Sequence, residues 1–186
     1  GEASLSRSLP FAILAAGVVL TTTAARVLRE EPPEAHTGGF GEPTCEHCHW
    51  GEPLNAPGGV LRIDGLPQSY EADRAYKLTI LLTAHELNVG GFELAARLGD
   101  AKQAGHFDTT TPGTIVTTSK TGIEYVSHTL EGVAAVRDTV RWSFVWHSPA
   151  DARQPVLFHA AANASNDDAS PLGDHIYTIT VTVSPR

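Results

Sequence analysis

Short runs in which apolar and polar residues alternate restrict the fold of this chain more than any other feature of its sequence. In the clearest run, residues 140–147, every second side chain up to Trp146 is apolar, and Trp142 lies on the same side. Successive side chains of a strand point to opposite faces of a sheet, so such a run buries one face and exposes the other. We therefore expect both tryptophans to lie in a core.

Eight strands of this kind are expected, separated by turns at the spacing of an all-β sandwich. The 17 glycines and 12 prolines agree with many turns. No long helix is expected after residue 37. The expected strands are residues 59–64, 76–83, 92–98, 114–118, 123–129, 140–147, 156–160 and 177–183.

The charge balance argues against nucleic acid as a partner. The chain has 13 basic and 21 acidic residues, which gives a formal net charge of -8. A surface of this sign repels phosphate backbones. With 186 residues, 41% of them hydrophobic, the chain is long enough for one globular domain and a tail.

A hydrophobic segment near the amino terminus predicts export. Residues 8–25 carry no charge and are bracketed by Arg7 and Arg26. As a helix they would extend about 27 Å, close to the roughly 30 Å of a bilayer core, so a single-span membrane anchor is one interpretation. The strictly apolar part is also short enough for a signal peptide, with small residues for cleavage at 23–25. In that case the protein would be secreted.

The sequence Cys45-Glu46-His47-Cys48-His49 has the C-x-x-C-H spacing of covalent haem attachment. Two residues between the thiols let both sulfurs reach the two vinyl groups on one edge of the macrocycle. The adjacent histidine can then place its imidazole beneath the iron. We expect one covalent haem c on Cys45 and Cys48, with His49 as the proximal iron ligand.

Other uses of this pair of cysteines remain open. The chain has no further cysteine, so no disulfide framework can hold the fold together. A structural zinc site normally needs four protein ligands, which distant histidines would have to complete. A thioredoxin-like dithiol would need a βαβ context that the sequence does not show.

The sixth iron ligand cannot be methionine, because the chain contains none. The sixth position can then be filled by histidine, by water or by another neutral donor, with lysine and the amino terminus as remote alternatives. We expect bis-His ligation, which gives a lower potential than a Met-ligated haem has. His47 lies inside the attachment loop, and His36 lies in the approach to it. The remaining candidates are His85, His106, His128, His147, His159 and His175.

The hydrophobic segment, the C-x-x-C-H motif and the expected strands together divide the chain into four parts. Residues 1–29 are the anchor or signal segment, and 30–44 are a linker that contains acidic residues, proline and glycine. Residues 45–58 form the haem-attachment segment, and 59–186 form the sandwich. Haem attachment places this sandwich on the extracytoplasmic, periplasmic side of the membrane.

Several segments, in order, resemble the reeler-like domain. More closely, the chain is similar from about residue 37 onward to the bacterial form of that domain with an amino-terminal C-x-x-C-H segment, the choice-of-anchor V proteins. The matching segments are GFEL at 91–94, AGHF at 104–107, YVSHT at 125–129, WSFVWHSP at 142–149, AANASN at 161–166 and GDHIYT at 173–178.

This resemblance implies an immunoglobulin-like, reeler-type β-sandwich in an exported protein. The Tyr-x-x-His-Thr element of the family places His128 at a recurring position, which makes His128 the distal-ligand candidate. Reeler-like domains without haem carry a similar His-Thr or His-Ser pair. His128 could therefore simply satisfy hydrogen bonds at the end of a strand.

The expected function is single-electron transfer by a monohaem c-type cytochrome, as a membrane-anchored subunit of a larger redox complex. Two alternatives stay open: a structural or adhesive module in which haem is incidental, and a haem sensor or peroxidase with an open sixth site. Trp50 could cover a haem edge or pack against the sandwich. An oxygen-rich loop could bind calcium or be an exposed polar turn; its residues are Asn163, Asn166, Asp167, Asp168 and Asp174.

Overall fold

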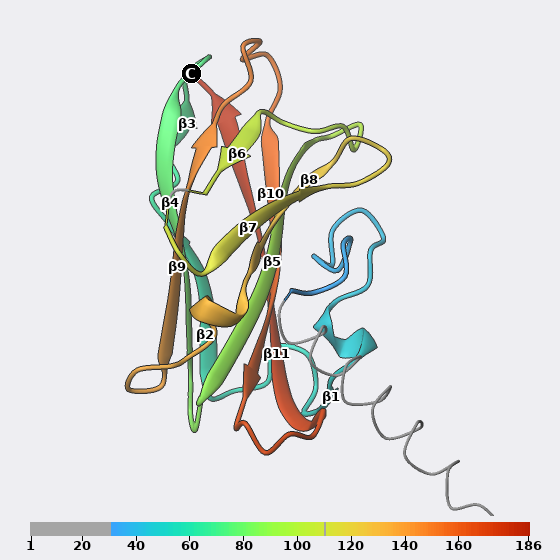
Figure 1. The fold of residues 1–186 in the computed structure, drawn as a ribbon. Helices are drawn as coiled ribbons and strands as arrows, with labels where there is room; N and C mark the ends of the chain where they lie inside the picture. The colour runs from blue at the N-terminus through green and yellow to red at the C-terminus, as the bar shows by residue number, and fades with distance from the viewer. Residues whose placement is uncertain (1–30, 110) are drawn as a thin grey trace, which may run out of the picture.

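The computed structural model describes residues 31–109 and 111–186, which form two β-sheets packed face to face (Figure 1). Two short 3₁₀ helices, η1 (Cys45–His47) and η2 (Leu130–Gly132), accompany the strands. The strands are β1 (Trp50–Gly51), β2 (Gly59–Asp64), β3 (Ser69–Tyr70), β4 (Ala75–Ala84), β5 (Val89–Leu98), β6 (His106–Asp108), β7 (Thr114–Thr118), β8 (Glu124–His128), β9 (Thr139–His147), β10 (Val156–Ser165) and β11 (Leu172–Pro185).

The larger sheet has the order β1-β11-β10-β5-β8-β7, with β3 also paired to β11, and the smaller sheet has the order β2-β4-β9-β6. The eight strands expected from the sequence are all present, and the all-β prediction is confirmed. The strands that the sequence did not reveal are β1, β3 and β6. Each has only two or three residues, which is too short for alternation to be detected.

The core between the sheets contains the two tryptophans expected there. Trp142 and Trp146 are 2% and 0% exposed. The Trp142 ring lies 4.6 Å from that of Phe92, and the Trp146 ring lies 4.9 Å from that of Phe158, so each indole joins β9 to the opposite sheet. Each indole N–H donates to a backbone carbonyl, at 2.7 and 2.9 Å, and this removes the cost of burying it.

The hydrophobic helix expected within residues 1–29 lies outside the described residues. Among residues 31–109 and 111–186, no helix is long and apolar enough to cross a membrane.

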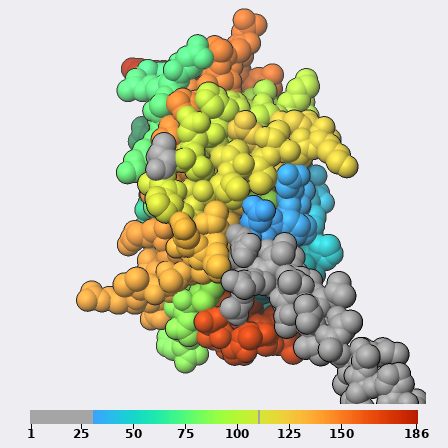
Figure 2. Space-filling view, in the orientation of Figure 1, coloured from blue at the N-terminus to red at the C-terminus, as the bar shows by residue number. Residues whose placement is uncertain are grey.

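The outer face of the larger sheet is covered by the segment that precedes β2. Ala35 packs against Ala95 and Tyr125 on this face, and Asn55 bonds with Thr178 at 3.0 Å. This segment, in blue and cyan, lies outside the larger sheet in Figure 1, and its blue part borders the yellow surface of β7 and β8 in Figure 2. It contains η1, so its position on the sheet decides where the cysteines lie.

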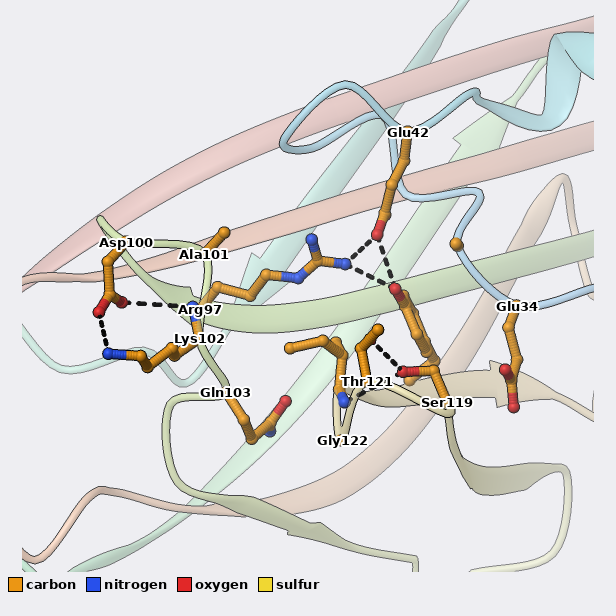
Figure 3. Close-up of a pocket in the computed structure, with 13 residues that line it drawn as sticks. Glu34, Glu42, Arg97, Asp100, Ala101, Lys102, Gln103, Ser119, Thr121 and Gly122 are labelled. Carbon is orange, nitrogen blue, oxygen red and sulfur yellow. Dashed lines mark hydrogen bonds and ion pairs between the residues drawn. The ribbon is translucent and has the colours of Figure 1, made fainter.

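A buried ion pair holds the covering segment in place. The carboxylate of Glu42 accepts hydrogen bonds from Arg97, Tyr125 and Thr37, the one from Tyr125 at 2.6 Å. The side chains of Arg97 and Glu42 are only 7% and 11% exposed, and Figure 3 shows them pointing toward one another. Burial alone would raise the pKa of Glu42, but these hydrogen bonds outweigh it, so the pKa lies below its ordinary value.

We expect Glu42→Gln to lower the free energy of unfolding by about 3–5 kcal/mol, because it leaves the buried Arg97 guanidinium without a counter-charge. Urea denaturation of the full chain would measure this loss. The exposed Glu46→Gln is the matched control and should change stability by less than about 0.5 kcal/mol. Because the pKa of Glu42 is lowered from 4.5, its contribution is present above that pH and is lost as the pH falls through the lowered value. Equal losses in both variants would contradict the assignment.

Candidate haem-binding site

The C-x-x-C-H motif forms the helical turn η1 and the two residues that follow it. The hydroxyl of Thr44 accepts a hydrogen bond from the Glu46 N–H at 3.2 Å, which caps the turn. The carbonyl of Cys45 accepts from the N–H groups of Cys48 and His49, at 3.1 and 3.0 Å. These bonds close the motif into a compact turn with both cysteines as free thiols and Cys48 exposed.

His49 is held by a buried carboxylate. Its Nδ1 lies 2.5 Å from Oδ2 of Asp174, which is 1% exposed. The side-chain amide of Asn163 lies 3.1 Å from the same Nδ1 and 3.2 Å from Asp174 Oδ2. A proton on Nδ1 that is donated to Asp174 leaves the Nε2 lone pair of His49 available to a metal. This is the usual arrangement around a metal-ligating histidine.

The sequence did not predict this role for Asp174 and Asn163, which it grouped with an oxygen-rich loop. In the structure both side chains contact His49. The rest of that loop forms local turns, in which the Asp168 N–H donates to Asn166 at 3.1 Å and the Ser170 N–H donates to Asp168 at 2.8 Å. Among the described residues, the carboxylates of this loop do not form a converging group of three with one another or with histidine or cysteine.

His128 lies on the same face of the sheet as His49. The β5–β8 ladder stops at the pair of Glu93 and Ser127, and beyond it the His128 ring bonds with the Phe92 backbone. Its Nδ1 lies 3.0 Å from the Phe92 nitrogen and 3.2 Å from the Phe92 oxygen. Burial, and secondarily the nearness of His49, lower the pKa of His128 and favour the neutral ring. In one tautomer the Phe92 N–H donates to Nδ1 and Nε2 carries the proton; in the other, Nδ1 donates to the Phe92 carbonyl and Nε2 is free.

Gly91 makes room for this histidine. A Cβ atom at Gly91 would lie 2.6 Å from Cε1 of the His128 ring, which is closer than real contacts allow. Gly91 is also the β5 partner of Asn163 on β10. Since Asn163 contacts His49, the two histidines lie over adjacent positions of neighbouring strands.

The other candidate distal histidines are either covered or lie away from His49. His159 lies on the same outer face, but Gly39 and Phe40 cover it, and its Nδ1 bonds with Thr180 at 3.0 Å. His175 alternates with Asp174 and so points to the opposite face of β11. His85 lies in the turn between β4 and β5, and the smaller sheet carries His106 and His147.

The cysteines are poorly placed for zinc or for dithiol exchange. Within the described part of the chain, the donor atoms of Cys45, Cys48 and His49 do not converge on a common point. Burial, reinforced by the charge of Glu93, raises the pKa of Cys45 to about 12, whereas reactive dithiols have a lowered pKa. The geometry thus disfavours both alternatives and is compatible with thiols that bond to a larger group.

Glu93 is a buried acid, although alternation along β5 places its side chain on the face opposite the core. It is 1% exposed, and its Oε2 accepts a hydrogen bond from the His36 N–H at 2.5 Å. Burial raises the pKa of Glu93 to about 8, and the charges of Glu42 and Glu34 add to that effect. Only the covering segment removes this side chain from water, so no strand pattern could have revealed its burial.

A cleft of about 690 Å³ lies elsewhere on the same face, beside the ion pair of Arg97 and Glu42 (Figure 3). Its lining combines polar side chains such as Asp100, Lys102 and Gln103 with apolar ones such as Ile123. None of the cysteines or candidate ligands lines it. The cleft is therefore separate from the C-x-x-C-H site.

Comparison with known proteins supports the fold. No protein-family model and no curated protein sequence matches the chain. Among solved structures, the reelin-N domain of F-spondin aligns with a TM-score of 0.51 and 18% identity, over 76% of this chain and 95% of that one. The human F-spondin reeler domain (fragment 1) aligns with a TM-score of 0.49 and 18% identity, over 72% and 93%. The reeler-like β-sandwich implied by the sequence resemblance is thus confirmed.

We expect the stability conferred by Glu93 to fall as the pH rises. Its folded pKa of about 8 exceeds the ordinary 4.5, so the folded state binds more protons than the unfolded state between these values. Glu93→Gln removes this titration. The free energy of unfolding of the wild type, relative to Glu93→Gln, should therefore decrease by a few kcal/mol from about pH 4.5 to pH 8. Glu131→Gln, at an exposed position, should show no such trend. A flat difference for Glu93→Gln would rule out its burial as a neutral acid.

Proposed function

We propose that this protein is an extracytoplasmic monohaem c-type cytochrome that transfers single electrons. The observation that carries the proposal is the hydrogen bond of 2.5 Å from His49 to the buried Asp174. It orients the histidine of a C-x-x-C-H motif with Nε2 free, as an iron ligand requires. Among the described residues, Nε2 of His49 has no hydrogen-bond partner.

The donor set on this face fits a haem. The S–H groups of Cys45 and Cys48 would each add across one vinyl group, so that two thioether bonds form and no atom is lost. His49 and His128 would hold the iron, each through its Nε2. When bound, the haem supplies the one-electron iron couple, and the chain supplies its ligands, their orientation and their charge.

Asp174 would strengthen His49 as an iron ligand. A carboxylate that accepts from Nδ1 makes the imidazole a stronger donor, which stabilises ferric over ferrous iron. Histidine at the sixth position, in place of methionine, acts in the same direction. Both effects favour a low reduction potential.

An exposed apolar edge beside the motif supports docking to redox partners. Trp50 is 53% exposed and Leu172 is 62% exposed, and the two residues are paired across β1 and β11. Trp50 directly follows His49, so a partner that covers this edge approaches the haem ligand. Partners of this kind, together with an amino-terminal anchor, would make the protein a membrane-bound subunit of a larger redox complex, as in a choice-of-anchor V type architecture.

A second candidate is a structural module without a functional haem. Two observations favour it: the similarity to F-spondin domains, and the hydrogen bonds of His128 to the Phe92 backbone, which satisfy a strand end. A haem sensor with an open sixth site is the third candidate, in which His128 keeps those bonds. Spectra of the purified protein separate these cases.

We expect the full chain, produced together with a cytochrome c maturation system, to carry one haem that survives denaturation. Intact mass would measure it, and the double variant Cys45→Ser/Cys48→Ser should lack it. The ferrous form of the wild-type protein should be low-spin and should not bind carbon monoxide. His128→Ala should become high-spin and bind carbon monoxide, whereas His159→Ala should remain low-spin. Absence of covalent haem would favour the structural module, and carbon monoxide binding by the wild type would favour the sensor.

We expect Asp174→Asn to raise the midpoint potential of the haem. A neutral amide is a weaker hydrogen-bond acceptor for the Nδ1 proton of His49 than a carboxylate is, so the imidazole becomes a weaker donor and stabilises ferric iron less. Spectroelectrochemical titration would measure the shift. Asp168→Asn, in the exposed loop before β11, is the matched control and should leave the potential unchanged. An unchanged or lowered potential in Asp174→Asn would argue against His49 as the iron ligand.

A further inference from the structure

A group of metal-ligand side chains lies on the opposite side of the sandwich. His106 and Asp108 belong to the edge strand β6, and His147 belongs to β9, its neighbour in the smaller sheet (Figure 1). Phe107 and Trp146, which alternate with them, are buried in the core. The three polar side chains therefore project from the outer face of the smaller sheet, whereas the haem-binding motif lies on the outer face of the larger one.

The geometry of this group is compact. His106 and His147 are directly opposite in the ladder, and their rings stack with centroids 4.3 Å apart and planes 3° apart. Nε2 of His147 lies 2.8 Å from Oδ2 of Asp108. One ligand atom from each of the three residues lies within 4.8 Å of the other two. No other set of three or more such residues among those described meets this condition.

We infer that His106, Asp108 and His147 bind a divalent transition-metal ion such as Zn²⁺ or Cu²⁺. Two imidazoles and a carboxylate match the borderline character of these ions, and water can fill the remaining coordination positions. The three donors project from adjacent backbones of one sheet, so the ladder already holds them together before an ion arrives. The bond between His147 and Asp108 would be exchanged for bonds to the metal.

A second histidine pair offers an internal comparison. His36 and His47 also stack, with ring centroids 5.2 Å apart, and Nε2 of His36 bonds with Nδ1 of His47 at 2.9 Å. This pair has no carboxylate that converges with it among the described residues, and the Nδ1 of His36 is engaged with backbone carbonyls at 3.0 and 3.1 Å. The pair therefore controls for binding by exposed histidines in general.

Isothermal titration calorimetry of the full chain, without an affinity tag, would test the site with ZnCl₂ as the probe. We expect one Zn²⁺ per chain. His106→Ala, His147→Ala and Asp108→Ala should each weaken that binding by at least about tenfold, since even an outer-shell change costs 10–100-fold. His36→Ala and Cys48→Ser should retain the wild-type affinity.

Thermal melting would verify that each variant is folded, and haem content should not change in His106→Ala. Wild-type affinity in both His106→Ala and His147→Ala would overturn the inference. Loss of the site in His36→Ala or Cys48→Ser would also overturn it, because the ion would then lie on the motif side of the molecule. Neither result depends on whether the haem proposal holds.

Discussion

The ion pair between Glu42 and Arg97 is the contact on which the rest of the candidate site depends. It joins the segment before β2 to the outer face of the larger sheet, and Tyr125 and Thr37 complete its hydrogen bonds. A buried ion pair favours one arrangement strongly, because loss of either partner leaves the other charge buried without a counter-charge. Through this pair the short turn η1, which has little structure of its own, acquires a defined position on a rigid sheet.

The covered face differs chemically from an ordinary sandwich core. The core between the sheets is apolar and aromatic, but the face under the segment contains Glu93, Asn163 and Asp174. Buried polar groups persist when they are paired or serve a purpose. Asp174 and Asn163 are paired with His49, and Glu93 accepts from the backbone of the segment. This face contains polar side chains because they bond with the segment before β2 that covers it.

The two outer faces of the sandwich thus differ in whether another segment covers them. A covering segment lies on the face of the larger sheet and positions His49 there, beside His128. The face of the smaller sheet stays open to solvent, and there the pairing of β6 with β9 brings His106 opposite His147. The proposed haem site and the inferred metal site would not interfere with one another, because the core lies between them.

Period-two alternation is a local property, so it was enough to predict the all-β architecture, the eight longer strands and the burial of Trp142 and Trp146. The C-x-x-C-H motif is also contiguous, so the sequence was enough to select Cys45, Cys48 and His49 as candidate haem-binding residues. The partners of His49 could not be predicted in this way, because Asp174 lies 125 residues away and is brought to His49 by strand register, which no local pattern encodes. The same is true of His128 over Gly91, of the buried Glu93, and of His106 beside His147. These contacts join residues that are distant along the chain, and strand pairing and the covering segment alone bring them together.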